Sequence, residues 1–199
     1  MKNKPTSKNH NKGYWRSETK MLQAIFKALK RHRGKLSVAM ISKELNLSRQ
    51  AFYTHHHDIN EAITAGEEAL LGEFSDYLNE KCPPQQGGGH TSNRRLYTAC
   101  FIFVSQRKSI FQQIASDIGQ QHIFYRMAAI MYPRMTIEWL PLGSAAPSPD
   151  SERVELFLWC VARLVSRWAS KEQCDFAKSG QYIKKLLAIT EEIGKKKFG

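Results

Sequence analysis

The stretch LSVAMISKELNLSRQAFYTHHHDINEAI, which covers Leu36–Ile63, decides the fold of this 199-residue chain. Ser37 is placed to cap a short helix in which Ile41 and Leu45 are spaced to face the same side. Asn46 follows at once, and asparagine tolerates the left-handed backbone that a tight turn requires. The first half of the stretch therefore predicts one short helix that ends in a turn.

The second half of the stretch predicts another short helix. Ser48 is a favourable N-cap for the segment Arg49–His56, whose inner face would be formed by Ala51 and Phe52. Two short helices joined by a turn of three or four residues make a helix-turn-helix motif. With the helix that begins at Ser17, the motif predicts a three-helix N-terminal domain.

The rest of the chain also has the periodicity of α-helices. Apolar residues recur at spacings of three and four, and no alternating pattern of useful length predicts a strand. Further helices are expected at about 58–82, 94–106, 108–117, 121–139, 152–169 and 179–193, with Pro133 as a kink or break. The expected fold class is therefore all-α, with the N-terminal helix-turn-helix domain followed by a larger helical bundle.

The positive charge of the chain is concentrated in its first third. The formal net charge is +12, from 30 Lys and Arg residues against 18 Asp and Glu residues. Residues 1–57 contain 13 basic residues but only two acidic ones, Glu18 and Glu44, which gives a local net charge of +11. Such a local excess is typical of nucleic-acid binding. We divide the chain into a disordered basic leader (1–16), a helix-turn-helix domain (17–58) and a second helical domain (59–199).

Composition and motifs argue against several other classes of protein. A hydrophobic fraction of 42% is typical of globular chains, and no segment is apolar enough for a signal peptide or a membrane span. The four cysteines include no C-x-x-C pair, a pattern that favours reduced thiols in a cytoplasmic protein. No nucleotide-binding, hydrolase or metalloprotease motif is present. We therefore expect no enzymatic activity and no cofactor.

The triplet His55-His56-His57 raises the question of a metal site. Adjacent helical residues point in different directions, whereas metal ligands on one helix face are three or four residues apart. Asp58 is the only neighbouring acidic residue. We therefore expect no metal, and we regard a pH-sensitive phosphate contact as the better interpretation of the triplet, since imidazole titrates near neutrality.

The second helix of the motif has the side chains that can read DNA. Arg49 can bond to guanine and Gln50 to adenine, and Thr54 lies one turn after Gln50 on the same exposed face. Phosphate contacts would fix the register of this helix in the major groove. The phosphate candidates are Lys35, Ser37, Lys43, Ser48, Tyr53 and His55. For Tyr53 the alternative is a half-buried surface tyrosine without a binding role.

These residues resemble the DNA-binding domain of the tetracycline-repressor (TetR) family of bacterial transcription regulators, and they look nearest to a Firmicutes-type subgroup. The resemblance covers about residues 17–65 and rests above all on the string Phe52-Tyr53-x-His55. It implies that the third helix enters the major groove and that the aromatic or His residues near its end contact phosphates.

Three positions depart from the pattern of that family. Asn46 stands where the family usually has glycine, which the left-handed tolerance of asparagine explains. His56 replaces the usual Phe and puts an imidazole where an aromatic anchor normally packs. Ile59 replaces a common lysine and removes one supporting contact to the DNA backbone.

The second domain is rich in large apolar side chains, which form either a helical core or the lining of an apolar ligand cavity. The resemblance implies a pocket for a small-molecule effector, for which the candidates are Phe74, Phe101, Phe103, Phe111, Phe124, Tyr125, Met127 and Met131. The last two helices have apolar stripes that suggest a homodimer interface, and the family implies a four-helix bundle there. The interface candidates are Phe157, Val161, Leu164, Trp168, Ile183, Leu186 and Leu187.

The sequence thus favours a cytoplasmic, effector-responsive regulator, expected to be a repressor that binds a pseudo-palindromic, double-stranded operator as a homodimer. Its expected partners are this DNA, a small-molecule effector and a second copy of the chain, with no membrane. The alternative is a helix-turn-helix protein that acts mainly through a protein partner, with weak DNA binding or none.

Overall fold

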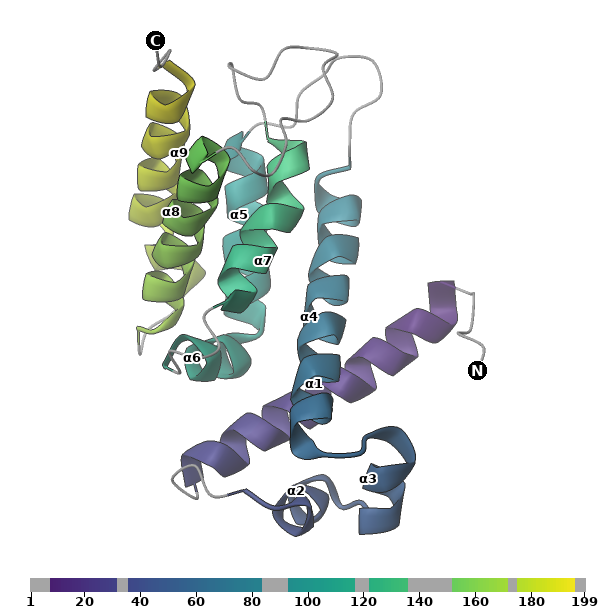
Figure 1. Cartoon of the computed structure of the whole chain (residues 1–199). Helices are drawn as coiled ribbons and strands as arrows, with labels where there is room; N and C mark the ends of the chain where they lie inside the picture. Colours follow the sequence, from purple (N-terminus) through teal and green to yellow (C-terminus); the bar gives the residue numbers. More distant parts are fainter. Residues whose placement is uncertain are drawn as a thin grey trace. The chain divides into compact units, whose positions relative to one another are not determined.

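In the computed structural model, the described residues are 8–31, 36–83, 93–116, 122–135, 152–171 and 175–195. All regular secondary structure in these ranges is helical (Figure 1), which confirms the prediction of an all-α fold. The chain divides into two compact units, residues 1–74 and 75–199, and the division falls inside the helix α4 (Ile59–Lys81). None of the described helices has the length and apolar character needed to cross a membrane.

The first unit contains α1 (Lys8–Arg31), α2 (Val38–Leu45), α3 (Arg49–His55) and most of α4. We expected the first helix to begin at Ser17, but Ser17 lies inside α1, and residues 8–16 of the expected leader are helical. The segment 8–16 contains no proline, and the helix continues through it despite Gly13.

The capping residues of the two short helices are those that the sequence indicated. The hydroxyl of Ser37 accepts a hydrogen bond from the backbone N–H of Met40, and the hydroxyl of Ser48 accepts one from Ala51. Asn46 ends α2 in the left-handed region, at φ 54° and ψ 43°. This left-handed residue turns the chain sharply, so that only three residues separate the end of α2 from the start of α3.

A small apolar core holds the first unit together. Ile41 of α2 and Phe52 of α3 are at most 1% exposed, and they form one cluster with Met21 and Ile25 of α1 and Ala62 of α4. The flanking partly buried members are Leu36, Val38, Leu45, Ile59 and Ile63. Every helix of the unit therefore contributes to a single core.

Helices α1 and α4 approach each other closely at Gly66. A Cβ atom at this position would lie 2.5 Å from the Cβ of Leu22 and 3.1 Å from the carbonyl oxygen of Glu18. Two turns after Gly66 on α4, the carboxylate of Glu73 accepts a hydrogen bond of 2.8 Å from the hydroxyl of Thr19 on α1. Glycine at position 66 thus lets the two long helices of the unit pack at short range.

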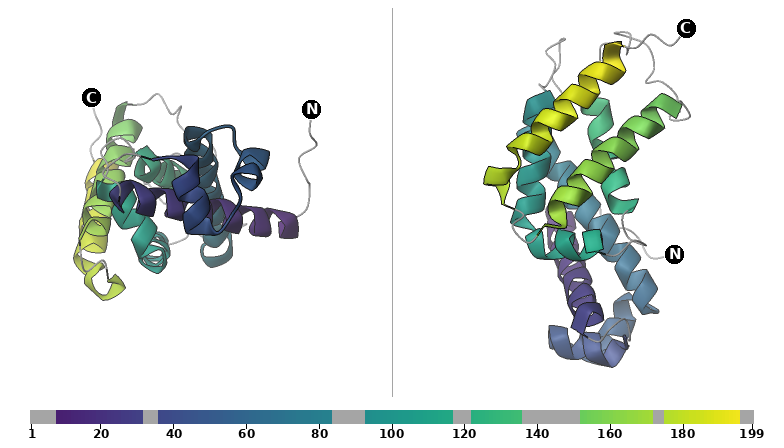
Figure 2. Two further views of the ribbon diagram at one scale, coloured as in Figure 1. Left: turned by 90° about the horizontal axis from the view of Figure 1, so that it is seen from below. Right: turned by 90° about the vertical axis from the view of Figure 1, so that its left-hand side faces the viewer.

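The second unit contains the end of α4 and the helices α5 (Asn93–Gln106), α6 (Lys108–Ser116), α7 (His122–Met131), α8 (Glu152–Ala169) and α9 (Gly180–Lys195). Short 3-10 turns follow α7 (Tyr132–Arg134) and precede α9 (Phe176–Lys178), and we refer to them as η2 and η3. Pro133 lies in η2, so the predicted break at this proline is confirmed. Figure 2 shows α8 and α9 in front of α5 and α7 in the right-hand view.

Aromatic rings dominate the core of the second unit. Phe103 lies against Phe111 with ring centroids 6.0 Å apart, and Phe111 lies against Phe124 at 5.8 Å. The hydroxyl of Tyr97 on α5 is 2.5 Å from that of Thr190 on α9 in a buried hydrogen bond. Burial raises the pKa of Tyr97 to about 12, with a smaller opposing effect from Thr190.

Burial separates the described cysteines into reactive and unreactive thiols. Burial raises the pKa of Cys100 to about 12 and also raises that of Cys82, whereas Cys160 on α8 is exposed. Because the thiolate is the nucleophile, iodoacetamide at pH 8 is expected to alkylate Cys160 in the native monomer, at high dilution, and to spare Cys82 and Cys100. Peptide mapping by mass spectrometry measures each site, and labelling in denaturant is the control. Native labelling of Cys100 as fast as that of Cys160 would contradict this core packing.

Candidate nucleic-acid interface

Helix α3 has one buried face and one exposed face. The three predicted base-reading side chains, Arg49, Gln50 and Thr54, are all exposed, as a helix that reads DNA requires. Gln50 and Thr54 are four residues apart, so they lie on neighbouring turns of the same face, and Arg49 is exposed at the start of the helix beside them. The hydroxyl of Thr54 donates to the carbonyl oxygen of Gln50 at 2.9 Å, which leaves its oxygen lone pairs and its methyl group facing outward.

Tyr53 and Phe52 are neighbours in sequence but face opposite ways. The Phe52 side chain is 1% exposed in the core, whereas Tyr53 is 54% exposed, and their rings meet edge to face with centroids 5.6 Å apart. Tyr53 also lines a hollow of about 450 Å³ with Leu36, Val38, His57, Asp58, Ile59, Asn60 and Ile63. The phenol is therefore fixed at its base by apolar contacts while its hydroxyl is free to reach a ligand.

The other predicted phosphate contacts lie around the same two helices. Ser37 and Ser48 are exposed, and their hydroxyls cap α2 and α3. Lys43 on α2 and His55 at the end of α3 are also exposed. Lys35 lies outside the described residues. The fold therefore places the described candidates on exposed positions of the α2–α3 pair.

Both acidic residues of the basic N-terminal third are paired with basic side chains of the same unit. The carboxylate of Glu44 on α2 forms ion pairs with Arg31 and with Lys27 of α1, the latter at 3.4 Å, and its side chain is only 14% exposed. Glu18 is buried, and its carboxylate is 3.1 Å from the Nε2 atom of His56. The outward faces of α2 and α3 therefore carry Lys43 and Arg49 without an acidic residue of either helix beside them.

The pair of Glu18 and His56 is a feature that we did not predict. His56 ends α3, and its imidazole is buried at 4% exposure with its ring centroid 5.7 Å from that of Phe52. The contact joins this end of α3 to α1, and neither of the two atoms makes a hydrogen bond of good geometry with any described residue. The sequence did contain a signal, because Glu18 lies three, four and seven residues before Met21, Leu22 and Ile25, on the apolar stripe of α1.

Burial of His56 corrects our interpretation of the histidine triplet. His55 and His57 are exposed, but the buried His56 side chain is unable to contact a phosphate. The carboxylate of Asp58 accepts a hydrogen bond from the N–H of Glu61 at 2.8 Å and caps α4. Within the described part of the chain, no group of three or more His, Cys, Asp or Glu residues is placed to hold a metal ion.

The rings that we expected to line an effector pocket form the core. Seven of the eight predicted side chains, all except Tyr125, are at most 2% exposed, and the rings of Phe103, Phe111 and Phe124 pack against one another. Tyr125 is half-buried and lies against Trp159 of α8, with centroids 4.8 Å apart. Sequence alone gives no way to separate the two roles, because a core and an apolar pocket use the same residue types.

Most residues of the predicted dimer stripe are likewise buried within one copy of the chain. Phe157, Val161 and Trp168 of α8 and Leu186 of α9 are at most 1% exposed within one copy of the chain. Ile183 is also buried, and Leu164 and Leu187 are partly buried. The stripe therefore faces the core of its own unit, and the exposed apolar residues of α8 lie on another face, at Leu156 and Trp159.

Comparison of the chain with protein-family models, with curated proteins and with solved structures finds no match. Functional inference therefore rests on the geometry of the site and on its chemistry.

The contact between Glu18 and His56 predicts that His56 contributes to the stability of the fold. His56→Ala leaves the Glu18 carboxylate buried without its partner and is expected to lower the free energy of unfolding by about 3 kcal/mol. His57→Ala, at an exposed neighbour, is the matched control and should change it by about 0.5 kcal/mol or less. Urea denaturation followed by circular dichroism measures both variants.

A double-mutant cycle isolates the interaction between the two side chains. Glu18→Leu combined with His56→Phe removes both polar groups, and the double variant should be clearly more stable than the sum of the single effects predicts. Strict additivity would show that Glu18 and His56 do not interact.

Proposed function

We propose that this protein is a DNA-binding transcription regulator of the TetR type, acting as a repressor, in which α1, α2 and α3 form a three-helix helix-turn-helix domain. One observation carries the proposal: α3 exposes Arg49, Gln50 and Thr54 while Phe52, on the side of the helix opposite Gln50 and Thr54, anchors it in the core. A recognition helix needs both, since it must be rigid in the domain and open to base edges.

The surroundings of α3 support the same role. Ser37 and Ser48 at the helix starts, Lys43 on α2 and Tyr53 on α3 provide hydroxyl and ammonium donors around the base-reading face. Phosphate contacts of this kind set the register and supply the salt-dependent part of the affinity. The inward pairing of Glu18 and Glu44 limits repulsion between the protein and the DNA backbone.

The proposal includes a small-molecule effector that releases the DNA. Helix α4 begins next to α3 in sequence and ends in the second unit, so a ligand that changes the second unit can act on the reading helix through it. The two binding equilibria would then be coupled reciprocally. The alternative role, action mainly through a protein partner, is an outcome of the test below.

Footprinting on DNA that flanks the coding region tests the binding itself. A protected site of roughly 15–30 base pairs is expected, with half-site centres about 34 Å apart if a two-fold dimer binds. Absence of any protected site at modest salt would exclude the DNA-binding proposal and favour the partner-protein alternative.

Two substitutions separate the roles of the exposed side chains. Tyr53→Phe removes a phosphate contact and should weaken binding to all sequences alike. Arg49→Ala should relax the preference at one base pair by about 1–3 kcal/mol. Lys81→Ala, an exposed lysine at the end of α4, is the control and should change neither. Titration of a set of singly mutated operators measures these effects, and an unchanged preference for Arg49→Ala would exclude base reading by Arg49.

We assign the homodimer interface to the exposed face of α8, in place of the buried stripe. Leu156 and Trp159 are 66% and 50% exposed, and Cys160 lies beside them. Glu155 precedes this apolar patch and Arg163 follows it, both exposed. Antiparallel pairing of two α8 helices about Trp159 brings Glu155 opposite Arg163 of the partner subunit, so the face is complementary to itself in charge.

Oligomeric state tests this interface. Leu156→Glu or Trp159→Glu buries an unpaired charge in the interface and should weaken the dimer by at least about tenfold in sedimentation equilibrium. Leu47→Glu, at an exposed leucine of the first unit, is the matched control. Mild oxidation should also cross-link the dimer through Cys160 and fail to do so in Cys160→Ser. A dimer insensitive to all these changes would exclude this face.

A further inference from the structure

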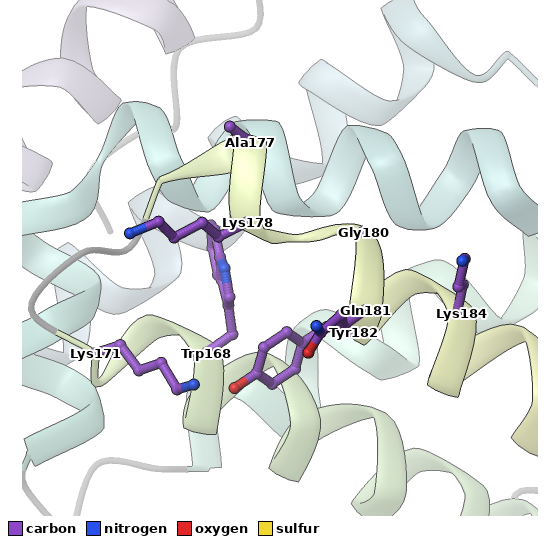
Figure 3. Close-up of a pocket in the computed structure, with 8 residues that line it drawn as sticks. All are labelled: Trp168, Lys171, Ala177, Lys178, Gly180, Gln181, Tyr182 and Lys184. Carbon is purple, nitrogen blue, oxygen red and sulfur yellow. The ribbon is translucent and has the colours of Figure 1, made fainter.

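The second unit has a cavity that none of the predicted effector residues helps to line, although Trp168, a predicted dimer-interface residue, does. Its volume is about 660 Å³, within the range of small-molecule sites. It lies where the end of α8, the turn η3 and the start of α9 meet (Figure 3). The lining residues are Trp168, Lys171, Ala177, Lys178, Gly180, Gln181, Tyr182 and Lys184.

The charge of the described lining of this cavity has one sign. Among the described residues that line it, three are lysines, Lys171, Lys178 and Lys184, and none is acidic. The nearby carboxylate of Asp175 accepts a hydrogen bond from the N–H of Ala177 and caps η3. The lysines surround a common space from three different elements, which favours an anionic ligand.

The wall of the cavity is aromatic. Trp168 is 1% exposed and meets Phe101 edge to face at 4.7 Å, and Tyr182 is buried beside it. Figure 3 shows the Lys171 side chain extending toward the Tyr182 ring, and its Nζ atom is 5.4 Å from the ring centroid. A flat apolar group that enters the cavity would therefore meet ring surface, with a cation close by.

Two polar features of the wall also suit an anion or another hydrogen-bond acceptor. The indole N–H of Trp168 is buried and has no hydrogen-bond partner among the described residues, which is unfavourable for a buried donor. Helix α9 begins at Gly180, so the positive end of its dipole faces the same space. A Cβ atom at Gly180 would meet no atom within 4 Å, which leaves the start of the helix open.

We propose that this cavity binds a small amphipathic anion. The lysines and the start of α9 hold its carboxylate, sulfonate or phosphate group, and Trp168 and Tyr182 hold its flat apolar part. The proposal does not depend on DNA binding, and its test uses no DNA, so either proposal can fail alone.

Fluorescence titration of the full chain with 1-anilinonaphthalene-8-sulfonate tests the site, because this probe combines a flat aromatic group with one anionic group. Saturable binding to one site is expected, and added salt should weaken it. The neutral analogue N-phenyl-1-naphthylamine lacks the sulfonate and should bind at least about tenfold more weakly, as expected for the loss of a charge-assisted contact. Equal binding of the two probes would overturn the assignment to an anion.

Three variants locate the bound probe. Lys171→Glu and Lys178→Glu should each weaken binding about tenfold or more, whereas Lys20→Glu, with the same change of charge on α1, should leave it within about twofold. Gly180→Phe fills the cavity from a position with free space and should abolish binding. Thermal melting checks that each variant is folded.

A second readout reports on the wall itself. The indole N–H resonance of Trp168 in a ¹H–¹⁵N spectrum should shift when the sulfonate probe is added, and it should not shift in Gly180→Phe. Probe binding that leaves this resonance unchanged, or that survives in all three cavity variants, would overturn the proposal.

Discussion

Helices α2 and α3 have eight and seven residues, and helices of this length are unstable in water on their own. They persist because Ile41 and Phe52 are inserted into one core with residues of α1 and α4. The geometry of the candidate interface depends on this constraint, since the same core that stabilises α3 also fixes which of its faces is exposed. The direction of Arg49 and Gln50 is thus a consequence of the burial of Phe52.

Polar side-chain contacts also hold α2 and α3 in place against α1. The Glu18–His56 pair joins the end of α3 to α1, and the pairing of Glu44 with Lys27 and Arg31 joins α2 to α1. A buried polar contact is weak evidence for stability, but its requirement for one geometry is good evidence for orientation. The first unit therefore uses its two acidic residues among positions 1–57 to hold helices rather than to balance the charge of its outer surface.

Helix α8 shows how one element can serve two surfaces. Its buried stripe, with Phe157, Val161 and Trp168, completes the core of the second unit, while Leu156 and Trp159 form a separate exposed patch. At its end, Trp168 and Lys171 also line the cavity. An amphipathic pattern predicts that a stripe will be buried, but it does not say whether the covering surface belongs to the same copy of the chain or to another.

The sequence by itself determined the features that depend on local chemistry. These are the approximate positions of the helices after α1, the caps at Ser37, Ser48 and Asn46, the break at Pro133 and the exposed face of α3. Only the tertiary structure decided that the expected pocket rings fill a core, that Glu18 meets His56 and that three lysines from separate elements surround one cavity. The physical reason is range: caps and periodicity act over three or four residues, whereas these contacts join residues that only packing brings together.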